Sequence, residues 1–256
     1  MSSGVSTGGA ASRVTAPDEP QGPNPRGSGA RGRSVGRVTS PSGVPARQAP
    51  RIWPAHPLRA AIVMVGIVAM LWLIELADRT VFVALDPPAG LDDDGIVPRT
   101  VDGLGGILWA PLLHGGFEHL ASNTVPLLVF GFLVLAGGLG QFVAVTAVIW
   151  LASGIGTWLI GSPGSTIGAS GIIFGWFAFL LVRGFFARSA GQIVLAVVLF
   201  GIYGGLLFGV LPSNPGISWQ AHLCGAIGGI LAARLTVAAD RRRAGPTDTP
   251  GLPAVS

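Results

Sequence analysis

Residues 168–171 read Gly-Ala-Ser-Gly, and the apolar run Ile172–Val182 follows them directly. With its flanks, this run is long enough to enter a lipid bilayer. A hydroxyl between two glycines at the mouth of a membrane helix is unusual, because polar groups are costly to bury in lipid. We therefore expect the other polar residues within the apolar segments of the chain to converge on Ser170.

The composition is that of an integral membrane protein. Half of the 256 residues are hydrophobic, the mean hydropathy is +0.62, and only 11% of the residues are charged. A soluble domain usually carries about 25% charged residues. A pI near 10.9 could indicate a nucleic-acid partner, but the arginines stand beside apolar runs, where they set membrane topology. We expect the lipid bilayer, and no nucleic acid, as a partner.

Apolar runs of about 20 residues predict an all-α, polytopic fold with six transmembrane helices. The expected spans are about 60–77, 119–136, 141–160, 168–182, 193–211 and 219–238. Residues 1–57 are rich in Arg, Ser, Gly and Pro and are expected to form a disordered tail. Residues 58–239 then form one membrane domain, and residues 240–256 form a short disordered C-terminal tail.

The charge distribution predicts the orientation in the membrane. The N-terminal tail, Arg183, Arg188 and the Arg241–Arg243 cluster all fall on one side of a six-span bundle, which the positive-inside rule makes cytoplasmic. The loop of residues 78–118 carries seven acidic residues and two arginines and falls outside. Both termini are thus expected in the cytoplasm. We expect the membrane to be a bacterial plasma membrane.

Four polar residues are predicted at a similar depth, a short way below the outer surface. His119 and Asn123 are spaced i, i+4 and share one face of the second span. Ser170 begins the fourth span, and His222 lies one turn into the sixth. Ionisable groups at such depth are functional hypotheses by default.

The glycines predict which helices touch. Gly171 and Gly175 form a GxxxG motif in the fourth span, and Gly225 and Gly229 form another in the sixth. If these two grooves pack together, His222 comes within hydrogen-bond reach of Ser170, as a base beside a nucleophile. The expected spans two to six contain no Asp or Glu, which favours a Ser-His dyad over a triad.

An oxyanion would be stabilised at the start of the fourth span. The first peptide N–H groups of a helix have no partner within the helix. Together with Asn123 and His119, the N–H groups beginning near Gly168 would bind a developing negative charge.

Three motifs resemble the signatures of the rhomboid intramembrane serine proteases. They are Gly168-Ala-Ser-Gly171, His119-x-x-x-Asn123 preceded by His114-Gly-Gly-Phe, and Ala221-His222-x-x-Gly225-x-x-x-Gly229. The resemblance covers about residues 60–238. It implies a protease that cleaves transmembrane protein segments without ATP, a metal or another cofactor. On matching positions, it makes Ser170 the nucleophile, His222 the base, and Asn123 with His119 the donors on the oxyanion side.

Two positions depart from the family pattern. Phe174 stands where well-studied members carry a tyrosine against the catalytic histidine, so stacking is kept and a hydroxyl hydrogen bond is not. Trp109-Ala110 replaces the frequent Trp-Arg of the first loop, which puts the anchoring of that loop in question. His114 is expected to be an interfacial loop residue that shapes the site without catalysing.

Simpler interpretations remain for several residues. Ser170 alone would be a packing residue, and His222, His119 and Asn123 could tie helices or loops together. Asp92–Asp94 lacks the ligand spacing of a calcium loop and is typical of a solvated acidic loop. Other residues are expected to be packing residues, namely Cys224, Gly201, Gly205 and Gly209, or interfacial ones, namely Trp219 and Gln220.

Two other functions fit parts of the sequence. A rhomboid-like membrane-protein binding factor without protease activity would suit Phe174 and Ala110, although both Ser170 and His222 are present. A small-solute transporter would use the same polar residues to line a path. Transporters often show internal repeats, and this chain shows none.

Overall fold

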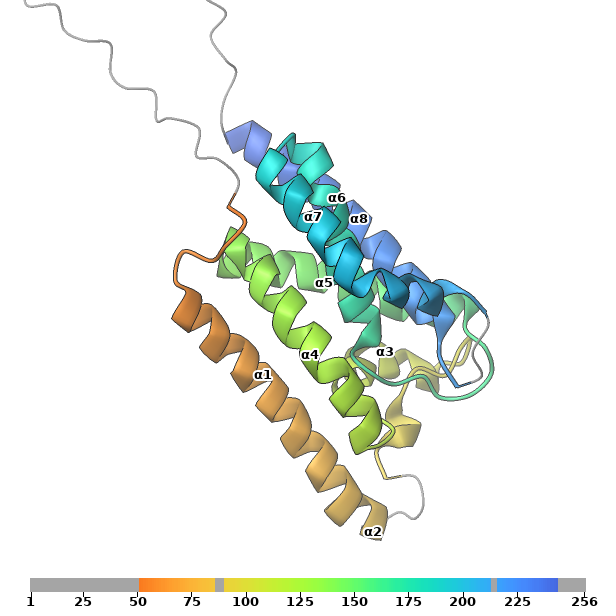
Figure 1. Cartoon of the computed structure of the whole chain (residues 1–256). Coiled ribbons are helices and arrows are strands. Elements are labelled where there is room, and N and C mark those ends of the chain that lie inside the picture. Colours follow the sequence, from red (N-terminus) through yellow and green to blue (C-terminus); the bar gives the residue numbers. More distant parts are fainter. Residues whose placement is uncertain (1–50, 86–89, 213–215, 244–256) are drawn as a thin grey trace, which may run out of the picture. The chain divides into compact units, whose positions relative to one another are not determined.

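The computed structural model describes residues 51–85, 90–212 and 216–243, and every regular element in these ranges is helical. Six helices are long and apolar enough to cross a membrane. The predicted all-α, six-helix membrane bundle is thus confirmed. The helices of Figure 1 are α1 (Pro57–Ala77), α2 (Val83–Leu85), α3 (Gly106–Trp109), α4 (Phe117–Val134), α5 (Leu139–Ile160), α6 (Ser170–Ala187), α7 (Ala190–Tyr203) and α8 (Trp219–Arg243).

Several helix ends differ from the sequence prediction. The first span runs past Ala77 through a π-helical turn, Asp78–Phe82, into α2. The fifth span is α-helical only to Tyr203 and continues as a 3₁₀ helix over Gly204–Val210. The last helix ends at Arg243, so residues 240–243 are helical and do not belong to a tail. Most of the predicted N-terminal tail and residues 244–256 lie outside the described residues.

The fourth span begins two residues later and ends five residues later than predicted. Gly168 has a φ of +120°, which is incompatible with an α-helix, so α6 starts at Ser170. At the other end the helix passes through Arg183, which was expected to follow the span. The Arg183 guanidinium is buried because Nη2 donates to Gln141 Oε1 at 3.0 Å and to Asp240 Oδ2 at 3.3 Å.

The two GxxxG motifs pack against each other, as the sequence predicted. A β-carbon built on Gly225 would collide with the carbonyl of Gly171, and one built on Gly229 would collide with the carbonyl of Gly175. The backbones of α6 and α8 therefore approach more closely than any side chain would permit. Figure 1 shows α6 and α8 running side by side.

The other face of α8 packs against α5. The Ser153 hydroxyl donates to the carbonyl of Ala221 at 2.9 Å, one residue before His222. Cys224 lies against Gly156, where an added β-carbon would collide with its sulfur. The interpretation of Cys224 as a packing residue is confirmed by this contact.

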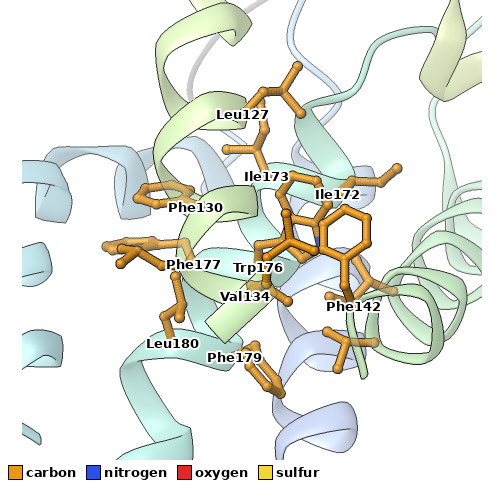
Figure 2. Close-up of a cluster of buried hydrophobic side chains, with 14 of the residues drawn as sticks. Leu127, Phe130, Val134, Phe142, Ile172, Ile173, Trp176, Phe177, Phe179 and Leu180 are labelled. Carbon is orange, nitrogen blue, oxygen red and sulfur yellow. The ribbon is translucent and has the colours of Figure 1, made fainter. Parts of the chain in front are cut away.

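Large aromatic side chains fill the space between α4 and α6 (Figure 2). The rings of Phe130 and Phe177 stack with their centroids 5.1 Å apart. Trp176 is 2% exposed, and its indole Nε1 donates to Thr146 Oγ1 at 3.1 Å, which joins α5 to this core. This core packs against the face of α6 that is turned away from α8. It thereby helps to fix the orientation of α6, which begins at Ser170.

The first loop is anchored by hydrogen bonds from two tryptophans of α5. The indoles of Trp150 and Trp158 donate to the carbonyls of Ile107 and Thr100, at 2.7 and 2.8 Å. The loop is thus held without the Trp-Arg pair. Trp109 is 55% exposed, as a residue at the membrane interface would be.

Arg79 ties the C-terminal end of α1 to the first loop. Its Nε donates to Glu75 Oε1 at 2.8 Å, and its Nη2 donates to Asp92 Oδ2 at 3.0 Å. Asp93 and Asp94 are exposed, as predicted for a solvated acidic loop, whereas Asp92 is half-buried. Burial raises the pKa of Asp92, and the charge of Arg79 opposes that shift.

Candidate active site

Ser170 and His222 lie within hydrogen-bond distance, as the sequence predicted. Ser170 Oγ is 2.8 Å from His222 Nε2. Ser170 is the first residue of α6, and His222 is in the first turn of α8 with only 6% of its surface exposed. The glycine contact between the two helices produces this proximity, because Gly171 adjoins Ser170 and Gly225 lies one turn after His222.

The backbone carbonyl of Gly209 orients the imidazole of His222. His222 Nδ1 lies 2.9 Å from this carbonyl, which can only accept a hydrogen bond. The neutral ring therefore carries its proton on Nδ1 and leaves Nε2 as the acceptor facing Ser170 Oγ–H. In serine hydrolases with a triad, a carboxylate holds the histidine in this tautomer. Here a main-chain carbonyl from the 3₁₀ segment after α7 takes the same position.

The contribution of Gly209 was not predicted from the sequence. The glycines of the fifth span were interpreted as packing residues, and the interpretation is wrong for Gly201 and Gly205. A β-carbon added at either position would have no atom of the described residues within 4 Å. Gly209 is different, because a β-carbon there would lie 2.7 Å from Phe174 Cζ and 3.1 Å from His222 Nδ1. Only a glycine lets the chain pass so close to the imidazole.

Phe174 stacks on the imidazole, as the sequence predicted. The ring centroids of Phe174 and His222 are 3.9 Å apart and their planes are 7° from parallel. The phenyl ring lacks a hydroxyl, so the stacking limits rotation of the imidazole without adding a hydrogen bond. Together with the Gly209 carbonyl, it leaves His222 one favourable orientation.

His119 faces the same site from α4. Gly115 N–H donates to His119 Nδ1 at 3.4 Å, so the neutral ring carries its proton on Nε2. The ring lies over Gly168, where a β-carbon would come within 2.8 Å of His119 Cε1 and 3.8 Å of Ser170 Oγ. Because Gly168 has no side chain, the imidazole of His119 can lie close to Ser170.

Asn123 is buried one turn further along α4, and its Nδ2 donates to the carbonyl of His119 at 3.2 Å. An amide nitrogen carries two hydrogens, so one remains to bind another group. The Gly168 N–H donates to the Ala110 carbonyl at 2.8 Å. It is therefore not free to bind an oxyanion, and Gly168 contributes to this region through the backbone turn that it forms. Within the described part of the chain, the peptide N–H groups of Ser170 and Gly171 have no backbone acceptor.

His114 is buried in the protein, and its prediction as an interfacial residue is wrong. It is 1% exposed, its Nε2 lies 3.4 Å from Ala169 N–H, and its ring packs edge-on against His119 at 5.2 Å. Burial, helped by the nearby His119, lowers the pKa of His114 to about 4. A neutral His114 can thus support both the turn before Ser170 and the ring of His119, in line with the expected site-shaping role.

Gln220 also departs from its predicted place at the interface. It is 4% exposed, and its amide hydrogen-bonds with Ser162 Oγ at 2.8 Å. This contact joins the start of α8 to the loop after α5, two residues from His222. In the described ranges no three His, Cys, Asp or Glu side chains are grouped as metal ligands would be.

Comparison with known proteins gives the family. The family profile described as Rhomboid domain matches residues 103–239. An uncharacterized protein of Mycobacterium tuberculosis (strain H37Rv) is 48% identical over 184 residues, which cover 68% of this chain and 74% of the relative. An uncharacterized protein of Mycobacterium leprae is 45% identical over 204 residues, covering 75% of this chain and 78% of that protein.

The chain therefore belongs to the rhomboid family, as its three motifs predicted. A more distant relative from Bacillus subtilis (strain 168) carries the name "Putative rhomboid protease YdcA". It is 33% identical over 135 residues, which cover 52% of this chain and 67% of the relative. With its six apolar helices, the protein is an integral, multi-pass membrane protein of this family.

Proposed function

We propose that this protein is an intramembrane serine endopeptidase that cleaves transmembrane or membrane-anchored proteins by a Ser170–His222 dyad. The observation that carries the proposal is the 2.8 Å contact between Ser170 Oγ and His222 Nε2, with Nδ1 held by the Gly209 carbonyl. This arrangement is a nucleophile, a base and an orienting group in series. Family membership supports the same reaction class.

In the first step, His222 Nε2 takes the proton of Ser170 as Oγ attacks the carbonyl carbon of the substrate peptide. The Gly209 carbonyl stabilises the imidazolium that forms, because it accepts from Nδ1–H in both protonation states. The imidazolium then gives its proton to the leaving amine, and an acyl-enzyme remains. Water attacks the ester with His222 as the base, and Ser170 is restored.

The negative charge on the attacked oxygen requires donors that are already in place. The proposed donors are the N–H groups of Ser170 and Gly171 and His119 Nε2–H, whose ring lies beside Gly168. The second hydrogen of Asn123 Nδ2, one turn further along α4, is the fourth proposed donor. Loss of one such donor typically lowers the rate by about 10²–10³. Glycine at 168 and neutral His114 keep this region compact and free of competing charge.

The substrate is a membrane-anchored protein, and the cut falls near the outer face. The positive-inside rule favours both termini in the cytoplasm of a bacterial plasma membrane, with Ser170 below the opposite surface. In this mechanism, water enters from that surface. A helical substrate must unwind locally to offer its carbonyl, which favours segments with helix-breaking residues.

Cleavage of a generic transmembrane reporter by the purified full chain tests the proposal. Wild type should cleave the reporter and label with a fluorophosphonate probe, whereas Ser170→Ala should do neither and His222→Ala should fall to background. A matched control is Ser122→Ala, which removes an exposed hydroxyl from α4. Cleavage that survives Ser170→Ala, or a wild type that binds the reporter without cutting it, would overturn the proposal in favour of a binding factor.

A further inference from the structure

An apolar groove of about 440 Å³ lies between α1, α4 and the beginning of α7, far along the helices from Ser170. Its lining side chains are all apolar: Trp53, Ala61, Met64, Val65, Leu128, Val129, Phe132, Leu133 and Leu195. The groove is in the part of the bundle where α1 and α7 begin and α4 ends. In an integral membrane protein, such a surface faces hydrocarbon, and an acyl chain is the occupant that matches its chemistry.

A polar cleft adjoins this groove and shares Leu133 and Leu195 with it. The cleft has a volume of about 20 Å³, which is room for roughly one water molecule. Four polar residues line it, namely Arg51, Gln141, Arg183 and Gln192. The two hollows are therefore neighbours, and arginines line only the cleft, whereas the groove is apolar throughout.

Arg183 is the buried cation of this cleft. It is only 8% exposed, and its Nη2 is paired with Gln141 and Asp240. Its Nε is buried and has no acceptor among the residues that the structure describes, and Gln192 Oε1 likewise has no donor there. A buried donor on a charged group costs free energy unless it has a hydrogen-bond acceptor. The cleft therefore has room for a bound group that accepts from Arg183 Nε.

The charge at this end of the bundle is positive. Arg51 and Arg188 are exposed here and Arg183 is buried, while Asp240 is the acidic partner of Arg183. Trp53 packs edge-on against Phe132 with the centroids 4.9 Å apart, and tryptophan is typical of the level of the lipid headgroups. An anionic headgroup is therefore the complement to this end of the groove.

We propose that this surface binds one anionic phospholipid from the leaflet facing the arginine-rich helix ends. One acyl chain occupies the groove between α1 and α4. The phosphate sits at the mouth of the cleft beside Arg51, and a single water in the cleft relays it to Arg183 Nε. The lining residues of α4 run from Leu128 to Leu133, a rise of about 8 Å at 1.5 Å per residue, which accommodates the part of an acyl chain nearest its headgroup.

The headgroup contact is tested by lipid binding to the full-length protein in detergent, followed by native mass spectrometry. Dioctanoyl phosphatidylglycerol should bind at least about fivefold more tightly than dioctanoyl phosphatidylcholine. Arg51→Gln should reduce this preference by about fivefold, the contribution of one arginine near an anionic lipid. Arg183→Gln should have a similar effect. Because Arg183 also contacts Gln141 and Asp240, Arg51→Gln keeps the test decisive if Arg183→Gln fails to fold.

Arg188→Gln is the matched control, since it removes the same charge at the same end of the bundle without touching the cleft. It should leave the preference unchanged. Equal binding of the two lipids, or an equal loss in Arg188→Gln, would overturn the proposal, because either result means diffuse attraction and not a site. Inorganic phosphate that binds as tightly as the anionic lipid would also overturn it.

The groove is tested by filling it. Ala61→Trp should weaken binding of the anionic lipid about tenfold or more, whereas Ala69→Trp, on an exposed position of the same helix, should not. Unchanged lipid binding in Ala61→Trp would overturn the assignment of the acyl chain. Displacement of the lipid by an uncharged transmembrane peptide, with no dependence on headgroup charge, would instead assign the groove to a protein segment. All of these measurements record binding and are independent of whether the protein cleaves peptides.

Discussion

The contact between α6 and α8 and the exposed helix α7 represent two extremes of packing in one bundle. In the apolar window of α6, 67% of the residues are buried, whereas in that of α7 the share is 11%. Glycines occur in both regions. Those at 225 and 229 lie against the backbone of α6, and those at 171 and 175 also lie against side chains of α5. Those at 201 and 205 have open space beside them.

Both regions nevertheless contribute to His222. The tightly packed pair supplies Ser170 and the imidazole, and the loosely packed segment supplies the carbonyl of Gly209. The proximity of the two side chains and the tautomer of the base therefore depend on parts of the protein with different local stability. Substitutions in each region should separate these two contributions.

Gly225→Val should have the largest effect. Its side chain would collide with the carbonyl of Gly171, so α6 and α8 must separate next to Ser170. We expect a loss of about 3 kcal/mol in stability, at the upper end of overpacking effects, and cleavage below detection. Thermal unfolding and reporter cleavage measure the two effects. Gly201→Val, on α7, is the control, and a similar loss there would show that the contact between α6 and α8 is not special.

Gly209→Ala should lower cleavage while preserving stability. The new methyl group would press on Phe174 and on His222 Nδ1 and shift the orienting carbonyl. We expect kcat to fall about ten- to hundredfold, a part of the 10²–10⁴ that a positioned base contributes. The unfolding temperature should hardly change, because no residue of this 3₁₀ segment is buried. The control Gly205→Ala, in the same segment, should change neither cleavage nor stability. If Gly209→Ala lost stability in proportion to its loss of activity, a positioning role would be contradicted.

Acidification should destabilise the protein through His114. Its pKa of about 4 is below the ordinary value, so the unfolded chain binds the proton more tightly. Stability is therefore complete above about pH 6.5 and declines as the pH falls toward 4, by up to about 1.4 kcal/mol per pH unit. Unfolding at pH 7 and pH 5 should show a shallower dependence for His114→Gln than for wild type. The exposed His56 provides the control His56→Gln, which should keep the wild-type slope.

Gly201→Ala should have the smallest effect, and a favourable one. No atom of the described chain lies within 4 Å of the new methyl group, so only the helix propensity changes. Replacing glycine by alanine within a helix stabilises it by roughly 0.5–1 kcal/mol. A small rise in unfolding temperature with unchanged cleavage is expected. A loss of activity would mean that α7 packs against a neighbour or a substrate at this position.

Much of the fold and the proximity of Ser170 and His222 were predictable from sequence. Two small-residue motifs on different spans indicated a close helix pair, and the position of each motif relative to Ser170 and His222 put the two side chains on the same contact. The aromatic ring at 174 was expected to stack, and it does. The catalytic roles of these residues stay predictions until cleavage is measured.

Three of the errors have a common cause. Gln220, His114 and Arg183 were assigned to interfaces or loops because polar residues near span ends usually face water. Each is buried because it meets a specific partner, at Ser162, Ala169 or Gln141, in a segment distant in sequence. Burial of a polar group depends on such a partner, and residue type alone does not reveal it.

Sequence alone determined that the protein lies in a lipid bilayer, that it crosses the bilayer six times, and which two helices touch. These properties follow from hydropathy and side-chain size, which act locally and add along the chain. Only the tertiary structure decided that a backbone carbonyl at Gly209 orients His222 and that Arg183 points into a cleft. Every residue has the same carbonyl, so its partner is set by how the helices are placed in space, and no sequence pattern records it.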